Sequence, residues 1–382
     1  MEKIYLDHNA TTPLAPEVLE TMIPVLRDSY GNPSSVHSFG RSIRVQLDEA
    51  REKVASLIGA RSTEIIFTSG GTEANNFALL GVALNDKTKG KHIITSKVEH
   101  PSILNPCRQL ENLGIKIDYL DVDRFGRIDI KNLESHLTES TVLISLQHAN
   151  SETGVLQDIK MVSEMAREKG IFFHTDAVQS VAKIPFSLEN YTVDMLSISA
   201  HKFNGPKGVG ALYLKKGMPT LFSPVCGGGQ EKKRRGGTEN VAGIIGFGKA
   251  CELAEKRMSE NSEVQELKDY FYKKVCELIP GTELLGDQQN SLPNTLNLAF
   301  EGVDGDTLLI GLDMEGVAVS TGSACSSGTG LPSHVLMAMG LPDEKINSSI
   351  RFSLGCNTSK SELDTVIGTL VRTVNLNKAA VS

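Results

Sequence analysis

Residues 64–84 read EIIFTSGGTEANNFALLGVAL and contain a strand pattern, a turn and a helix pattern in direct succession. Residues 64–68 form a short β-branched run, as expected of a buried strand. Two adjacent glycines, Gly70 and Gly71, interrupt this run, and residues 73–84 are compatible with a helix. Strands that lead through turns into helices are the building units of α/β proteins, so this stretch predicts the α/β class.

The same alternation continues on both sides. Apolar residues recur at steps of three and four along 43–57, which predicts an amphipathic helix that ends at Gly59. Helical patterns are also present at 101–112 and 158–169. Further strand patterns lie at 92–96, 115–120, 141–146, 171–175, 194–199 and 210–214. We therefore expect a large domain with a mostly parallel seven-stranded sheet that helices cover on both faces.

The pattern changes after about residue 255. It then predicts a long helix at 263–279, a strand at 292–300, a helix at 305–315, a strand at 348–354 and a closing helix at 359–375. We interpret this region as a smaller α+β C-terminal domain. The length of 382 residues agrees with two domains, at roughly 150 residues for each.

The composition, with 40% hydrophobic and 22% charged residues, is that of a globular enzyme. No run approaches the roughly 18 continuous apolar residues of a membrane helix, and the N-terminal residues do not resemble a secretion signal. We therefore expect a cytoplasmic protein with no membrane partner. A net charge of -7 argues against a nucleic-acid partner, because nucleic-acid-binding domains usually carry a basic surface, and the basic cluster at 232–235 is local.

The glycine turn of residues 69–72 opens a helix directly after a strand. Free backbone N–H groups and the Thr72 hydroxyl would lie at the positive end of the helix dipole, which suits a phosphate group. The turn lacks the glycine spacing of nucleoside-triphosphate and dinucleotide sites, so those ligands are disfavoured.

Two further polar residues follow strands. Asp176 lies at the carboxyl edge of the sheet, where it can hold the protonated pyridine nitrogen of pyridoxal phosphate (PLP) or act as a helix N-cap. Lys202 lies in SAHKFNGPKG at 199–208, directly after the strand at 194–199. A lysine kept dry in this position can form an imine, whereas a lone lysine in a turn is usually a surface residue. Together with Thr72, these residues predict a PLP site.

These motifs and their order resemble the cysteine desulfurases of the NifS/IscS type, in the class V aminotransferase superfamily. The resemblance spans nearly the whole chain. Besides the three segments above, it is carried by YLDHNATTP at 5–13, GNPSSVH at 31–37, VEHPS at 98–102, HANSETG at 148–154, RGGTEN at 235–240, GSAC at 322–325 and SIRFS at 349–353. The resemblance implies a PLP-dependent transferase of fold type I. It also implies a large PLP-binding domain at 16–257 and a small domain made of 1–15 and 258–382.

The resemblance implies a role for each matching residue. Lys202 would form the Schiff base with PLP, Asp176 would pair with the pyridine nitrogen, and Gln179 would bind the ring hydroxyl oxygen. His100 would stack on the ring and assist proton transfer, although a histidine before a proline is otherwise a helix-start residue. The phosphate would be held by Gly71, Thr72, Ser199 and His201, with Thr238 reaching it from the partner subunit of a homodimer.

Asn150 and Arg351 would orient the cofactor and the substrate carboxylate, with Asn150 counted among the residues that bind the cofactor and both among those that bind the substrate. A guanidinium fork suits a carboxylate better than a lysine does, although Arg351 could instead pair with a structural acid. The implied reaction converts L-cysteine to L-alanine and transfers the sulfur to Cys325 as a persulfide. An iron–sulfur scaffold protein or another acceptor would then take the sulfur.

Cys325 differs from the other cysteines because it lies in STGSACSSGTG at 320–330, a run of small residues. We expect this loop to be mobile and exposed, so that its thiol can take sulfur and carry it outward. No Cys-x-x-Cys pair suggests a disulfide framework or a zinc site. The other five thiols are expected to be small buried hydrophobes: Cys107, Cys226, Cys251, Cys276 and Cys356.

Some alternatives stay open. A selenocysteine lyase or an aminotransferase would share the PLP site, although the Cys325 loop argues against a simple aminotransferase. A non-catalytic sulfur-relay or scaffold protein is disfavoured by the intact Lys202 and Asp176. The acceptor could serve iron–sulfur assembly, nitrogenase maturation or RNA thiolation, and Cys325 could bind a metal only through an iron–sulfur cluster shared with a scaffold.

Overall fold

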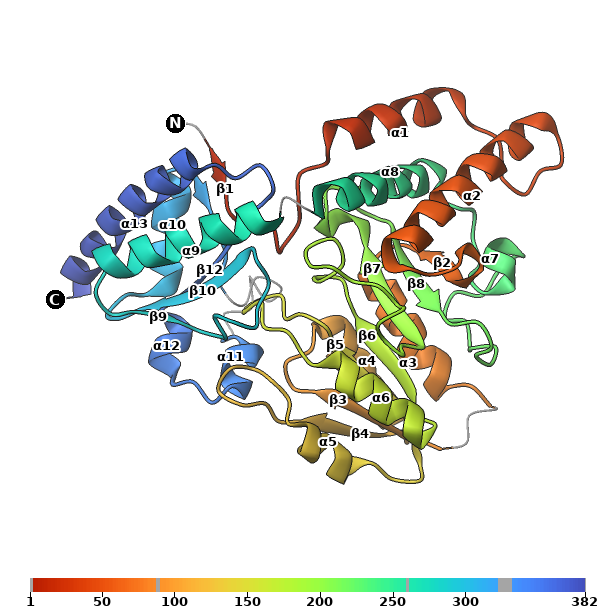
Figure 1. Cartoon of the computed structure of the whole chain (residues 1–382), viewed down its shortest axis with the longest axis horizontal. Coiled ribbons are helices and arrows are strands. Elements are labelled where there is room, and N and C mark those ends of the chain that lie inside the picture. The colour runs from red at the N-terminus through yellow and green to blue at the C-terminus, as the bar shows by residue number, and fades with distance from the viewer. Residues whose placement is uncertain (1–2, 87–89, 259–260, 322–331, 382) are drawn as a thin grey trace.

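The computed structural model describes residues 3–86, 90–258, 261–321 and 332–381. Its central sheet is built from seven strands: β2 (Ile65–Thr68), β3 (His92–Ser96), β4 (Lys116–Leu120), β5 (Thr141–Gln147), β6 (Phe172–Asp176), β7 (Met195–Ser199) and β8 (Gly210–Leu214). They lie in the order β2-β8-β7-β6-β5-β3-β4, and only β8 runs antiparallel to its neighbours. The expected mostly parallel seven-stranded α/β sheet is confirmed (Figure 1).

Helices cover both faces of this sheet (Figure 1). Neighbouring residues of a strand point to opposite faces. Ile65 therefore belongs to the apolar core shared with α2, α6 and α8, whereas Ile66 belongs to the core shared with α3 and α4. The helices of this part are α1 (Pro16–Asp28), α2 (Ser38–Ile58), α3 (Gly71–Ala83), α4 (Pro101–Asn112), α5 (Ile130–His136), α6 (Ile159–Lys169), α7 (Gln230–Lys233) and α8 (Val241–Arg257), with 3-10 turns η1 (Ser62–Glu64) and η2 (Ala200–Lys202).

A second core lies around a three-stranded antiparallel sheet of order β12-β10-β9. Its strands and helices are β9 (Thr282–Leu284), β10 (Thr295–Phe300), β12 (Ser349–Ser353), α9 (Asn261–Leu278), α10 (Gly305–Met314), α11 (His334–Ala338), α12 (Asp343–Asn347) and α13 (Lys360–Val381). The N-terminal β1 (Ile4–Tyr5) joins this part by pairing with β11 (Val317–Ala318). Because this core contains Ile4 and Leu6 and otherwise only residues after 263, we retain 16–257 and 1–15 with 258–382 as the proposed domains.

The closing helix is longer than the apolar pattern predicts. The expected end at residue 375 follows the buried Val374, but α13 continues to Val381. Among residues 375–378, whose side chains the structure describes, Asn377 is buried, and its side chain bonds the backbone N–H and C=O of Asp304. A polar contact therefore holds the helix beyond Val374. Within the described ranges, no helix is long and apolar enough to cross a membrane.

The direction of the strands positions the site. The six parallel strands end at one edge of the sheet, and the segments that follow them meet there. β2 leads into the start of α3, β3 into His100, β6 ends at Asp176, and β7 leads through Ser199 to Lys202. Residues that are far apart in the sequence are thus brought to one place.

Candidate active site

A cavity of about 250 Å³ lies at this edge of the sheet. Eight of the eleven described residues that we expected at the site line it: Gly71, Thr72, His100, Asp176, Gln179, Ser199, His201 and Lys202. The other lining residues are Ala10, Asn75, Ser102, Gln147, Ala149, Ser151 and Val178. The structure therefore brings together the expected lysine, its acidic partner and the phosphate turn. Asn150, Thr238 and Arg351 do not line this cavity.

One end of the cavity is the start of α3. No side chain caps this helix, so its first-turn N–H groups face the cavity without a competing protein acceptor. Gly70 has a φ of 152°, which favours glycine, and a Cβ built on Gly71 would lie 2.7 Å from Val178 Cγ2. Ser199 lines the same end. The glycines therefore let the start of α3 pack closely against Val178, with its N-terminus at the cavity.

Asp176 lies at the other end, where its carboxylate is held on both oxygens. Asn75 Nδ2 donates to Oδ2 at 2.7 Å, and the Val178 N–H donates to Oδ1 at 3.0 Å. The side chain is buried but lines the cavity. The two donors thus fix the orientation of the Asp176 carboxylate, so that it can pair with a cationic nitrogen.

Lys202 is held by the N-terminal segment. Its Nζ donates to the carbonyl oxygens of Asn9 at 2.6 Å and Ala10 at 2.9 Å. Gln179 bonds the same Asn9 carbonyl through Nε2 at 2.9 Å, and its Oε1 accepts a 2.6 Å bond from the buried Lys183. Burial, and then the charge of Lys202, hold the pKa of Lys183 well below its usual range. Residues before α1 therefore form one wall of the site.

Two histidines of the cavity are kept neutral. Burial lowers the pKa of His201 to about 4, with Lys202 acting in the same direction. Burial also lowers the pKa of His100, while Asp176 raises it and Lys202 and His334 lower it. His100 is in addition the N-cap of α4, because Nδ1 accepts from the Ser102 N–H at 3.1 Å. It is therefore a helix-start residue and a cavity residue at once.

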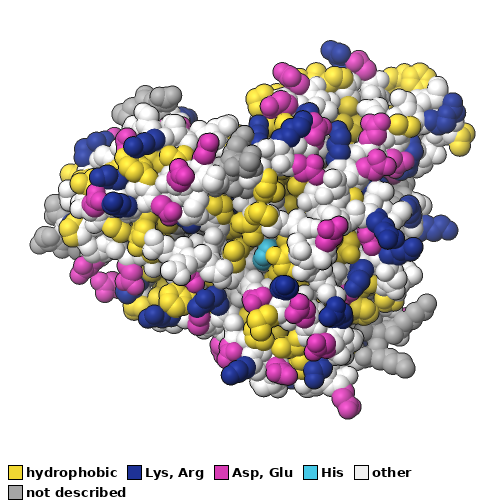
Figure 2. All heavy atoms as spheres, viewed as in Figure 1, with side chains coloured by type: hydrophobic (Ala, Val, Ile, Leu, Met, Phe, Trp, Pro, Cys, Tyr) yellow, Lys and Arg dark blue, Asp and Glu magenta, His cyan; other side chains and the backbone are white. Residues whose placement is uncertain are grey.

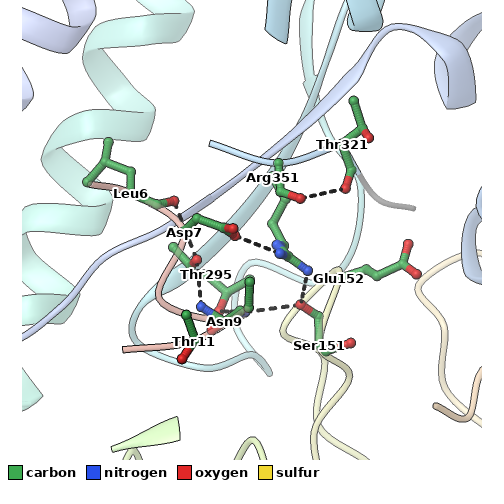
Figure 3. A network of polar contacts seen from close by, with 12 residues as sticks. Leu6, Asp7, Asn9, Thr11, Ser151, Glu152, Thr295, Thr321 and Arg351 are labelled. Carbon is green, nitrogen blue, oxygen red and sulfur yellow. Dashed lines mark hydrogen bonds and ion pairs between the residues drawn. The ribbon is translucent and has the colours of Figure 1, made fainter. Parts of the chain in front are cut away.

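Arg351 lies on β12 and does not line the cavity. Figure 3 shows its contacts with Asp7 and Ser151. Its Nη2 pairs with Asp7 Oδ1 at 2.7 Å, and Nη1 donates to the backbone oxygen of Ser151, a lining residue, at 3.2 Å. The guanidinium is almost fully buried, and its Nε has no partner among the described residues. Arg351 therefore pairs with a structural acid, as the alternative interpretation expected, and still has one donor to spare.

Asn150 and Thr238 lie in other surroundings. Asn150 is buried; its Oδ1 accepts from the backbone N–H groups of Glu152 and Thr153, and its Nδ2 donates to the Val98 oxygen. It thereby fixes the turn that carries Ser151 into the cavity. Thr238 is exposed and lines a separate hollow beside Arg235 and Glu239. Cys325 lies outside the described residues.

Several site residues were not expected from the sequence. Asn75 lies three positions after Thr72, so both project from the same face of α3. Two fully buried carboxyl groups flank the site: burial raises the pKa of Glu99 to about 8 and that of Glu152 to about 7. Helical spacing could have revealed Asn75. Nothing local distinguishes the two glutamates, because their burial depends on the assembled fold.

The basic cluster at 232–235 is only partly solvated. Arg234 donates to the backbone oxygens of Thr63 and Ile65, and Arg235 forms an ion pair with Glu73 at 2.8 Å. Lys232 and Lys233 are exposed. On the face shown in Figure 2, acidic and basic side chains are interspersed. The arginines of this cluster therefore hold the loop before α8 against the start of α3.

The expectation that five cysteines are buried is wrong for two of them. Cys226 and Cys356 are exposed and Cys276 is half-buried, whereas Cys107 and Cys251 are buried. Both exposed cysteines adjoin glycines in loops that do not pack into a core. The residue type alone therefore does not predict whether a cysteine in a loop is buried.

Comparison with known proteins identifies the family. The model of the class V aminotransferases matches residues 4–366. Cysteine desulfurase IscS of Dictyoglomus turgidum is 54% identical over 374 residues, which cover 97% of this chain and 94% of the relative.

Solved structures agree with this match. A NifS-like protein has a TM-score of 0.92 at 37% identity and covers 98% of this chain and 100% of its own. SspA in complex with cysteine has a TM-score of 0.82 at 35% identity, with 92% and 99% covered. The fold, the order of motifs and these matches together confirm the expected resemblance: the chain belongs to the class V aminotransferase family and is similar over its full length to the IscS/NifS cysteine desulfurases.

Proposed function

We propose that this protein is a PLP-dependent cysteine desulfurase that converts L-cysteine to L-alanine. The observation that carries the proposal is the meeting of Lys202, Asp176 and the uncapped start of α3 in one cavity. The cavity lies at the carboxyl edge of the sheet, where α/β proteins bind their ligands. Full-length relatives that are named cysteine desulfurases support the same activity.

The residues of the cavity fit PLP. The start of α3 suits the phosphate, with Gly71, Thr72, Ser199 and His201 around it. At the other end, the donor-held carboxylate of Asp176 suits a protonated pyridine nitrogen, and Gln179 suits the ring hydroxyl. When bound, PLP supplies a sink for the electrons released at the substrate carbon.

The protein's own residues then have distinct tasks. Lys202 would hold PLP, and its amine would move a proton at the substrate α-carbon. His100 assists proton transfer at the opposite wall of the cavity. The substrate carboxylate is assigned to Arg351, because a guanidinium fork suits a carboxylate. Asn150 acts on the substrate through the turn that carries Ser151.

Cys325 receives the sulfur. Its thiolate attacks the sulfur of the substrate cysteine, the carbon–sulfur bond breaks, and its electron pair stays with the carbon skeleton that leaves as alanine. The described residues before and after the segment 322–331 contact Arg351 and Glu152, and these contacts support this role. Ser320 pairs with the backbone of Arg351, and Ser333 Oγ donates to Glu152 Oε2 at 2.5 Å.

The active form is proposed to be a homodimer. Apolar side chains are exposed on α1, in the loop that follows it and at the start of α2: Leu19, Ile23, Leu26, Tyr30, Val36 and Phe39. Thr238 is exposed on the loop before α8, and we propose that it reaches the phosphate of the partner subunit, as the resemblance implies.

The fate of the sulfur follows from the likeness to the relatives named IscS. We propose that the Cys325 persulfide passes in the cytoplasm to an iron–sulfur scaffold protein or another sulfur acceptor. The small residues at 320–330 support delivery by a segment that reaches outward. A cluster shared with the scaffold through Cys325 is the metal contact that this proposal allows.

The experiment follows both products. PLP-loaded protein is incubated with L-cysteine, alanine is quantified, and the Cys325 persulfide is detected by alkylation and mass spectrometry. Cys325→Ser should reduce the alanine rate at least about 100-fold. The matched controls Cys226→Ser and Cys356→Ser change the exposed thiols and should retain the wild-type rate. A 2-oxo acid in place of alanine would mean an aminotransferase, and an undiminished Cys325→Ser rate would contradict the sulfur step.

A further inference from the structure

We propose that Asn75 and Ser102 are positioning residues that hold His100 Nδ1 without a proton and direct the proton of the neutral ring to Nε2. The inference rests on the proposed function, because His100 matters as a proton-transfer group. It adds two residues that the sequence motifs do not assign. It also specifies which nitrogen of the neutral ring donates a hydrogen bond into the cavity.

A continuous chain of hydrogen bonds carries the inference. Asn75 Nδ2 donates to Asp176 Oδ2 at 2.7 Å and to Ser102 Oγ at 2.8 Å. Ser102 Oγ lies 2.7 Å from His100 Nδ1, and the Ser102 N–H donates to the same nitrogen at 3.1 Å. Asn75, Ser102 and Asp176 are all buried. The chain therefore joins the two polar walls of the cavity away from bulk water.

The direction of each bond follows from the groups at the two ends. An aspartate carboxylate only accepts, so the amide must present its NH2 group to Asp176. If the Asn75 amide were turned round, its oxygen would face the carboxylate oxygen and repel it. Asn75 Oδ1 is accordingly buried with no partner among the described residues, while Nδ2 makes two bonds. Asp176 thus fixes the orientation of the amide.

The direction of the hydrogen bonds at Ser102 then decides which nitrogen of His100 carries the proton. Ser102 Oγ accepts from Asn75, so its own proton is available for His100 Nδ1. The backbone N–H of Ser102 points at the same nitrogen. A ring nitrogen that meets two donors carries no proton itself, and the neutral imidazole then has its proton on Nε2. At rest, His100 can donate from Nε2 but cannot accept there.

This arrangement also opposes the charged ring. Protonation of Nδ1 would set a third donor against the Ser102 N–H and hydroxyl. Burial, Lys202 and His334 act in the same direction, and Asp176 acts against them, so that the pKa of His100 is lowered overall. His100 is therefore prepared to donate a hydrogen bond from Nε2 into the cavity while its ring stays neutral.

The test reads the histidine directly by NMR. PLP-loaded protein with 15N-labelled histidine side chains is titrated without substrate, and His100 is assigned with a His100→Gln variant. The wild type should show an unprotonated Nδ1 and a protonated Nε2. Ser102→Ala removes the hydroxyl donor but keeps the backbone N–H, so the pH midpoint of His100 should rise by about 0.5 to 1 and the second tautomer should appear.

A second variant and a control make the outcome decisive. Asn75→Ala leaves the Ser102 hydroxyl free to rotate and should shift His100 in the same direction by a smaller amount. Ser145→Ala is the matched control, because Ser145 Oγ lies 2.8 Å from Nδ1 of His174 in the sheet core, and it should leave His100 unchanged. A wild-type His100 protonated on Nδ1, or the same midpoint in Ser102→Ala, would overturn the inference. Loss of alanine formation in a wild type with the expected tautomer would instead count against the proposed function.

Discussion

The site has a cofactor end, which is the cavity from the start of α3 to Asp176, and a substrate end, which lies beside the cavity at Arg351. The two are built in different ways. The end that suits the cofactor uses residues at the ends of β2, β6 and β7, and each lies in a recognisable local motif. The substrate end joins Arg351 to Asp7, 344 positions away, and to Ser151. The ends of neighbouring strands bring the first set together. The second set forms only when the N-terminal segment packs against β12. The cofactor end can therefore be predicted from the local sequence, whereas the substrate end depends on tertiary assembly.

The largest loss of activity is expected when Lys202, in the cofactor end, is replaced. Lys202→Ala removes the group that joins PLP and moves the α-proton, so the rate of alanine formation should fall by about 10³-fold or more. The absorbance of PLP bound through the lysine should be absent from the spectrum. PLP-loaded wild type serves as the control. Retention of both the band and the activity would show that Lys202 is not the PLP lysine.

Arg351→Lys tests the substrate end alone. Lysine keeps the charge but not the fork, so one donor to the carboxylate or to Asp7 is lost. We expect KM for L-cysteine to rise about 10-fold to 100-fold, while the PLP spectrum stays as in the wild type. Steady-state kinetics and absorbance are measured on the same samples. A changed PLP spectrum with an unchanged KM would reverse the assignment of the two ends.

The buried Glu99 allows a test of how the free energy of unfolding depends on pH. Its pKa rises from 4.5 to about 8 in the folded protein, so the folded state binds a proton more tightly than the unfolded chain. The free energy of unfolding should therefore fall as the pH rises through this interval, by an amount on the order of a few kcal/mol. Glu99→Gln should flatten this dependence in denaturant titrations at pH 5, 6.5 and 8. An equal slope in the variant would assign the dependence to other groups.

Thr238 should give the smallest effect. If it reaches the partner's phosphate, Thr238→Ala removes one hydrogen bond and should raise the Kd of PLP about 5-fold. Dialysis against decreasing PLP concentrations measures the affinity, and size-exclusion chromatography checks that the dimer persists. Thr365→Ala, on the exposed side of α13, provides the control. An unchanged Kd in a persistent dimer would remove Thr238 from the site.

The sequence predicts most of the cofactor end because its signals are local. A strand pattern, a glycine turn and a helix pattern suffice to place Thr72, and the same holds for Lys202 after β7. Asn75 could have been added from its spacing on α3. The pairing of Arg351 with Asp7 could not, since nothing in SIRFS at 349–353 or in the N-terminal segment indicates the partner. The burial of Glu99 and Glu152 likewise appears only when several elements are packed together.

The main-chain contacts of Lys202 have a consequence for sequence variation. Ala10 holds the lysine through its carbonyl oxygen, which every amino acid possesses. The segment is fixed on both sides, by the pairing of β1 with β11 and by the bond from the Thr12 N–H to the His201 oxygen. Substitutions at position 10 should therefore be tolerated far better than the deletion of that one residue, which shifts the register. A library of insertions and deletions would reveal this wall of the site, whereas a library of side-chain substitutions would overlook it.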